Sequence, residues 1–141
     1  TFWTESLGPT AALKTLEIMK KNNTWEYITK LGKFIVSKWV VLAKKNKIKI
    51  KINGIPALCS FVFLSKNHQE YKTFITQEML KNSFLATTTI YVSMAHNKKI
   101  LRKYFNCLDK IFSIIAKCEN GDDIYRYLET TKSETDFARL N

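Results

Sequence analysis

The sequence is poor in the residues that mark disulfide frameworks, metal sites and disordered linkers. It contains three cysteines, Cys59, Cys107 and Cys118, with no CxxC spacing, and only two histidines, His68 and His96. An odd number of scattered cysteines with so few histidines indicates neither a disulfide framework nor a zinc site, and it favours a reducing cytoplasmic compartment. Only 4 glycines and 2 prolines occur, which excludes collagen-like and low-complexity composition.

Long apolar runs are also missing. The longest strongly apolar stretch, Ile55 to Leu64, is interrupted by Pro56 and Ser60. A membrane-spanning helix needs roughly 20 apolar residues, so we expect no membrane partner. The N-terminus has no basic region followed by an apolar run and no initiator Met. It therefore does not resemble a signal peptide, and we expect the chain to be a piece of a longer protein.

Arginine is scarce although the chain is strongly basic. There are 23 Lys plus Arg against 12 Asp plus Glu, a formal net charge of +11, and only three of the basic residues are arginine. Bidentate recognition of phosphate and guanine favours arginine. We therefore interpret the lysines mostly as solvated surface charge and expect no nucleic-acid partner. A stand-alone basic module that binds nucleic acid or an acidic protein remains the alternative.

Apolar residues make up 45% of the 141 residues and aromatic residues 13%, which suits a single domain over residues 1–141 with one core. Apolar positions that recur every three or four residues predict helices over about 7–21, 68–81 and 98–120, and another that begins near 25 and ends in the lysine-rich run 44–47. Thr24 is expected to cap the second helix, and Asn67 with Glu70 resembles a capping box for the third. Asn82 is expected to end that third helix in a left-handed conformation. Asp122 is expected to cap a short final helix through Leu128.

Three segments carry strand signals. Lysine and isoleucine alternate over 47–52, Asn53-Gly54 is a strong hairpin-turn signal, and 57–64 is a more apolar returning strand. Residues 87–94 are rich in β-branched and aromatic side chains and predict a third strand. The order ααββαβαα predicts an α+β domain with a small antiparallel sheet of about three strands and helices packed on one face.

Catalytic motifs are few. Ser93 lies at the end of the third predicted strand and His96 follows it, and they would be the nucleophile and base of a self-contained hydrolase, although no GxSxG motif surrounds Ser93. We expect His96 to be structural instead. The cysteines lie in apolar patterns, where burial makes a thiol inert.

The start of the chain carries a resemblance. The segment Thr1-Phe2-Trp3-Thr4-Glu5, followed by Leu7-Gly8-Pro9 and by 11–16 (AALKTL), resembles the opening of the C-terminal small domain of class III pyridoxal-phosphate (PLP) aminotransferases. The branch it is most similar to is that of glutamate-1-semialdehyde aminomutase. Gly54-Ile55-Pro56 and 92–96 (VSMAH) before a long helix follow in the same order, so the resemblance covers nearly the whole chain.

The resemblance implies a cytoplasmic, dimeric fold-type I transferase or isomerase whose large domain lies upstream. That large domain would supply the Schiff-base lysine and most of the PLP site, and the substrate would be a small-molecule amino donor or acceptor. The chain alone would hold no catalytic residue and no metal. It would close the active site and contribute to the dimer, and Thr1 would contact the PLP phosphate of the neighbouring subunit.

Two departures from the family pattern bear on the substrate. Ser6 stands where the branch commonly has arginine, and 86–89 (ATTT) lacks the arginine that some class III aminotransferases use to hold a substrate carboxylate. The second absence favours the aminomutase-like branch. A small domain separated from its large domain is also expected to expose apolar side chains near its start, at Phe2, Trp3 and Leu7.

Overall fold

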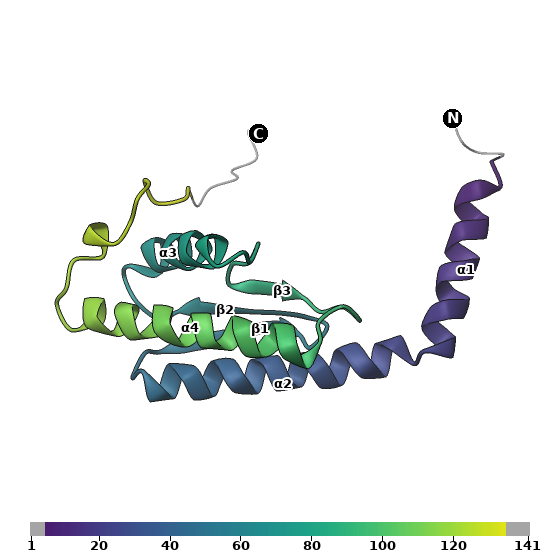
Figure 1. Cartoon of the computed structure of the whole chain (residues 1–141), viewed down its shortest axis with the longest axis horizontal. Coiled ribbons are helices and arrows are strands. Elements are labelled where there is room, and N and C mark those ends of the chain that lie inside the picture. The colour runs from purple at the N-terminus through teal and green to yellow at the C-terminus, as the bar shows by residue number, and fades with distance from the viewer. Residues whose placement is uncertain (1–4, 135–141) are drawn as a thin grey trace.

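The computed structural model describes residues 5–134 (Figure 1). It confirms the α+β class and the predicted order of elements, with the last element reduced to a single 3₁₀ turn. In chain order these are α1 (Leu7–Lys21), α2 (Thr24–Lys45), β1 (Ile50–Ile55), β2 (Leu58–Phe63), α3 (His68–Lys81), β3 (Thr89–Tyr91), α4 (Lys98–Glu119) and the 3₁₀ turn η1 (Ile124–Arg126).

The three strands form an antiparallel sheet in the order β1-β2-β3. Helices α2, α3 and α4 cover one face of this sheet, and α4 lies between α3 and α2 (Figure 1). Along β2, Cys59, Phe61 and Phe63 are buried against the helices and the residues between them are not. This period of two is what a strand with one covered face requires.

Aromatic side chains join the sheet to all three helices. The ring of Phe61 lies 4.9 Å from Trp39 of α2 and 5.8 Å from Phe112 of α4, and Phe63 lies 5.4 Å from Tyr71 of α3, all edge-on. Edge-to-face pairs at these distances stabilise a core beyond their buried area. Strand β2 is therefore the centre of the packed domain.

The hairpin turn lies three residues later than the sequence predicted. Asn53 and Gly54 belong to β1, and the strands connect through residues 56–57, so that Ile52 pairs with Phe61. A turn at 53–54 would place Phe61 and Phe63 opposite residues 46 and 44, at the end of α2. Gly54 is required for another reason: its φ is +84°, and the Leu58 carbonyl oxygen lies 2.2 Å from where a Cβ would be.

Several predicted caps are displaced by one residue. Asn23, in a left-handed conformation, precedes α2 in place of Thr24, and Ser83 has the positive φ that was expected of Asn82. Asp123, and not Asp122, caps η1 by accepting from the Tyr125 N–H. Helix ends depend on local competition between neighbouring polar residues, which a periodic pattern does not resolve.

Strand β3 is shorter than the predicted 87–94. Its ladder with β2 covers three residues, and two further backbone hydrogen bonds extend it, from Phe61 N to Thr88 O and from Val92 N to Ala57 O. Beyond them the chain turns toward α4, where Asn97 caps the helix by accepting from the Ile100 N–H. No helix among residues 5–134 has the length and apolarity needed to cross a membrane.

Candidate functional site

Thr1, the predicted contact to the PLP phosphate, lies outside the described residues, as do Phe2 and Trp3. Its role stays a prediction. Ser6 is the N-cap residue of α1, and its side chain makes no capping hydrogen bond. Leu7, the described member of the expected apolar start, is 71% exposed.

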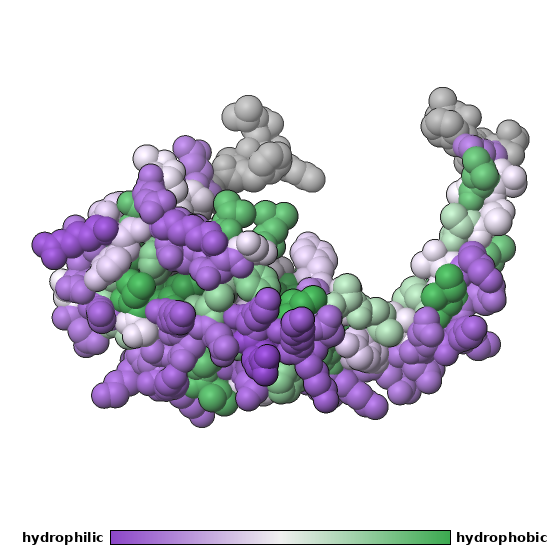
Figure 2. All heavy atoms as spheres, in the orientation of Figure 1, coloured by the Kyte–Doolittle hydropathy of each residue, from purple (hydrophilic) through white to green (hydrophobic). Residues whose placement is uncertain are grey.

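Helix α1 stands away from the rest of the molecule (Figure 1) and buries none of its residues. Its apolar stripe, which has the helical spacing of Ala12, Leu13, Leu16 and Met19, is largely open: Leu13 is 70% exposed and Leu16 is 61% exposed. Figure 2 shows this apolar surface along the projecting helix. Isolated helices of about 15 residues are only marginally stable in water. Helix α1 would therefore be stabilised by another protein surface packed against its apolar stripe.

The sheet face opposite the helices carries a second uncovered apolar surface. The strand register places Ile55 opposite Leu58 and Leu58 opposite Tyr91, and all three are exposed. Val62, two residues after Ser60 on the same face of β2, is exposed too. A contiguous apolar row across three strands is typical of a surface that packs against another domain or subunit. We call this row the open sheet face.

Beside the open sheet face, the loop between α3 and β3 borders a hollow of about 280 Å³. Leu85, Tyr91 and His96 line this hollow, and Leu85 is 98% exposed. No Lys or Arg is among the lining residues, so neither of these side chains is available there to bind a phosphate or carboxylate. The side-chain oxygen of Thr87, in the same loop, is buried and has no hydrogen-bond partner within the described residues.

Ser93 and His96 lie on the turn between β3 and α4. The backbone N–H of Ser93 donates to Nδ1 of His96 at 3.0 Å, and Ser93 Oγ lies 3.3 Å from the same nitrogen. A serine nucleophile needs a base whose acceptor nitrogen is free, and a third group that orients the base. Here the backbone amide uses Nδ1, and within residues 5–134 no carboxylate is bonded to the ring. The geometry does not support a hydrolase.

His96 instead helps to hold the turn. Its backbone oxygen accepts from the Tyr27 hydroxyl at 3.1 Å, which ties the start of α4 to α2. Two of the three cysteines are unsuited to chemistry as well: Cys59 and Cys118 are buried, and burial raises the pKa of both thiols, whereas Cys107 is half-buried. Within the described residues, no three His, Cys, Asp or Glu side chains gather as metal ligands would.

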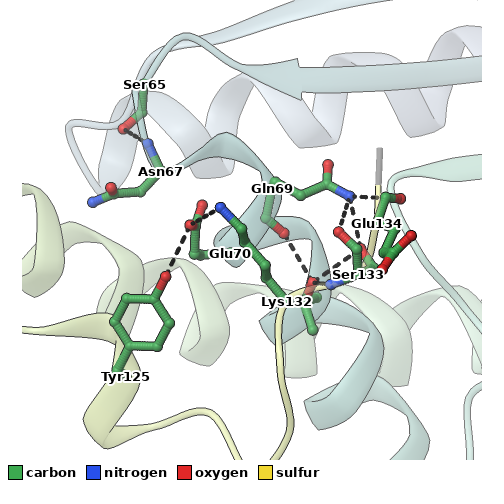
Figure 3. Close-up of polar contacts among 9 residues, drawn as sticks. Ser65, Asn67, Gln69, Glu70, Tyr125, Lys132, Ser133 and Glu134 are labelled. Carbon is green, nitrogen blue, oxygen red and sulfur yellow. Dashed lines mark hydrogen bonds and ion pairs between the residues drawn. The ribbon is translucent and has the colours of Figure 1, made fainter. Parts of the chain in front are cut away.

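Polar contacts fasten the segment after η1 onto α3 (Figure 3). Gln69 Nε2 donates to the Ser133 carbonyl at 2.7 Å, and the Ser133 N–H donates to Thr73 Oγ1 at 2.9 Å. Glu70 accepts from the Tyr125 hydroxyl at 3.1 Å and from Lys132 Nζ at 3.3 Å. Glu70 therefore does not complete the predicted capping box, and Asn67 makes no side-chain cap bond. We call these contacts the α3 clamp.

The α3 clamp is structural. Glu70 is buried, which alone would raise its pKa, but hydrogen bonds from its backbone N–H, Lys132 and Tyr125 outweigh burial and hold the pKa below the usual range. A carboxylate that is ionised and already bonded to several donors is a poor general acid or base. The clamp partners lie more than 50 residues apart in the sequence, so no local pattern could have indicated them.

The described residues do not form a PLP site by themselves. All 20 lysines lie in the described part of the chain, and every one of them is exposed. A Schiff-base lysine works in an enclosed pocket, where burial lowers its pKa and makes it a nucleophile. None of these lysines has that environment.

Comparison with known proteins gives one informative likeness. No protein-family model matches the chain. Among solved structures, the PLP internal aldimine form of the FumI protein from Sphingopyxis sp. MTA144 superposes with a TM-score of 0.71 at 16% sequence identity, over 89% of this chain and 31% of that one. The chain thus spans about a third of the length of the structure it matches. At this identity the likeness shows the fold, and this chain therefore shares its fold with part of a larger PLP-containing protein.

Proposed function

We propose that this chain is the C-terminal small domain of a cytoplasmic PLP-dependent aminotransferase or aminomutase of class III. The observation that carries the proposal is the fold likeness, which takes in 89% of this chain but only 31% of a PLP-bound protein. The opening sequence motif, which resembles that of class III PLP aminotransferases, also supports the proposal. The exposure of every lysine supports a Schiff-base lysine that lies outside this chain.

The two uncovered apolar surfaces fit this role. The open sheet face, with Ile55, Leu58 and Tyr91, would pack against the enzyme's own large domain. The stripe of α1, with Leu13 and Leu16, would contribute to the dimer. Both surfaces are apolar and contiguous, as obligate interfaces are.

The chemistry would come from the absent part of the enzyme. When bound, PLP supplies an electron sink for amino-group transfer. This chain would hold Thr1 near the phosphate of the neighbouring subunit's cofactor, since a hydroxyl and a backbone N–H close to a helix start can both donate to an anion. Its remaining contribution would be to close the active site against water.

The absence of arginine in 86–89 favours the glutamate-1-semialdehyde aminomutase-like branch within class III. The hollow beside Leu85 and Tyr91 supports this narrower proposal, because no Lys or Arg lines it. A substrate carboxylate would therefore have to be held by residues of the large domain.

The absorption spectrum of the full-length gene product, purified with PLP, tests the proposal. We expect a visible band of the lysine-bound cofactor and its loss on addition of an amino donor, whereas residues 1–141 alone should give no such band. A folded, intact full-length protein that binds no PLP would overturn the proposal. Steeply salt-sensitive binding to nucleic acid by that protein would then favour the stand-alone basic module.

A further inference from the structure

A groove runs along the outer surface of the helical layer, between α2 and α4. It has a volume of about 590 Å³, and apolar side chains form its floor, among them Phe34 and Val41 of α2 and Phe105 of α4. The two helices run parallel here: Tyr27 contacts His96 near their starts, and Lys45 contacts Asp109 farther along. The lining residues span twelve positions on each helix, from 31 to 42 and from 98 to 109, and the eleven steps between the first and the last correspond to about 16 Å of groove.

The floor of the groove is open to solvent along its length. Phe34 is 44% exposed and Val41 57% exposed, and the ring of Phe34 lies 6.1 Å from that of Phe105 across the groove. A small-molecule pocket buries most of its ligand in an enclosed cavity. An open apolar strip of three helical turns suits instead the apolar face of a third helix laid between the first two.

The rim of the groove is cationic. Lys38, Lys98 and Arg102 line it, and among the described residues none of the three is in an ion pair. The acidic residue of the lining, Asp109, is paired with Lys45, and this ion pair together with the Asn46 amide holds its pKa below the usual range. Helices α2 and α4 together carry eleven Lys or Arg against three Asp or Glu. Arg102 is one of only three arginines in the chain.

We propose that this groove is a docking site for an acidic amphipathic helix of another protein, whose apolar stripe would cover Phe34, Val41 and Phe105. Its flanking Asp and Glu side chains would pair with Lys38, Lys98 and Arg102. Charge complementarity selects this occupant. Helix α1 of a second copy has an apolar stripe too, but it carries three lysines and one glutamate and would meet the cationic rim with like charge.

The site is separate from the surfaces of the proposed function. The open sheet face lies on the other side of the sheet from α2 and α4. Figure 2 shows apolar surface between charged side chains over α2 and α4 on the face turned to the viewer. The proposal therefore stands whether or not the full-length protein binds PLP.

The test is fluorescence anisotropy of residues 1–141 with a labelled peptide of about 18 residues, or five helical turns, with leucine at i, i+3, i+4 and i+7 and glutamate at the flanking positions. One control peptide has lysine for every glutamate, and another has the same composition with the leucine pattern scrambled. We expect the acidic amphipathic peptide to bind at least about tenfold more tightly than either control. Its binding should weaken as salt is raised.

Paired variants locate the binding surface. Arg102→Glu should weaken binding of the acidic peptide by about tenfold or more, whereas Lys103→Glu, the same charge change at an exposed neighbour that does not line the groove, should change it less than about threefold. Val41→Ser should weaken binding, and Val62→Ser, the same change on the open sheet face, should not. All four substitutions are at exposed positions, and circular dichroism checks their folding.

Four outcomes would overturn the proposal. These are equal binding of the acidic and lysine peptides, no binding of the acidic peptide, and equal effects of Arg102→Glu and Lys103→Glu. The fourth is occupation of the groove by something else. Self-association of the free chain that Val41→Ser abolishes would assign the groove to a second copy. An oligonucleotide could also displace the peptide. If it does, and if Val41→Ser leaves the affinity for the oligonucleotide unchanged, the cationic rim would be assigned to nucleic acid.

Discussion

Inside the core, the indole N–H of Trp39 donates to the hydroxyl of Tyr104 at 3.0 Å, and both side chains are buried. Tyr104→Phe removes the acceptor and leaves the indole N–H without a partner in an apolar environment. We expect a loss of about 1–3 kcal/mol in the free energy of unfolding, measured by urea denaturation. Tyr91→Phe removes a hydroxyl from a side chain that is 75% exposed and should change stability little. Equal effects of the two variants would contradict this account.

Glu70 is the residue through which pH should act on the α3 clamp. Because its pKa is lowered in the folded chain, its carboxylate stabilises the fold above the unfolded-state pKa of about 4.3, and this stabilisation is lost as the pH falls through the lower folded-state value. Glu70→Gln should therefore cost about 1–2 kcal/mol at pH 7 and progressively less in acid. Urea denaturation of both proteins across the pH range measures the difference.

The control for Glu70 is Glu17→Gln. Glu17 pairs with Lys14 on the surface of α1, and both side chains are more than half exposed, so the change should have little effect on stability at any pH. A constant gap between wild type and Glu70→Gln from neutral to acid pH would contradict an ionised role for Glu70. Such a result would mean that Glu70 stabilises the fold through packing and neutral hydrogen bonds and not through its charge.

At the scale of the element, Gly32 of α2 packs against the backbone of Pro56, the residue that follows β1. A Cβ at this position would lie 1.8 Å from the Pro56 carbonyl oxygen, which is backbone and cannot rotate away. Gly32→Ala should therefore destabilise the protein by about 1–3 kcal/mol or more, although the same change in an open helix is stabilising. Gly8→Ala in α1, where nothing lies within 4 Å, is the matched control and should raise helicity slightly. Thermal denaturation and far-ultraviolet circular dichroism distinguish the two.

Periodic elements could be predicted from the sequence, and their ends could not. The apolar spacing of α4 lies within one stretch of chain, so the sequence predicted this helix to within one residue. The turn at 56–57 depends on pairing Phe61 with Ile52 over the helices, and Gly32 is needed only because the Pro56 carbonyl approaches α2. The Glu70 contacts to Tyr125 and Lys132 join distant segments. Such tertiary contacts override local propensity, and the residues of a short segment cannot predict them.

At the scale of the whole molecule, the sequence predicted that Leu7 would be exposed, but it did not predict how much more apolar surface would remain uncovered. In α1, Leu13 and Leu16 have the spacing of a core-facing stripe, yet no part of the described chain packs on them. The open sheet face was implied by helices on one side only, although its continuity across Ile55, Leu58 and Tyr91 required the strand register. The predicted contact of Thr1 with a cofactor stays a prediction, because it involves a second subunit.

These uncovered surfaces should make residues 1–141 self-associate when no other protein covers them. We expect the weight-average mass of residues 1–141, measured by sedimentation equilibrium, to rise with concentration, because covering α1 and the open sheet face removes apolar area from water. Leu13→Lys and Ile55→Lys should each reduce this rise, whereas Leu80→Lys, at an exposed leucine of α3 outside both surfaces, should not.

The pattern of these effects separates the two surfaces. A response to Leu13→Lys alone would place the contact on α1, the proposed dimer surface, and a response to Ile55→Lys alone would place it on the face proposed for the large domain. A constant monomer mass at every concentration would contradict the small-domain proposal, since an interface of this apolar character exposed to water drives association in the absence of its natural partner.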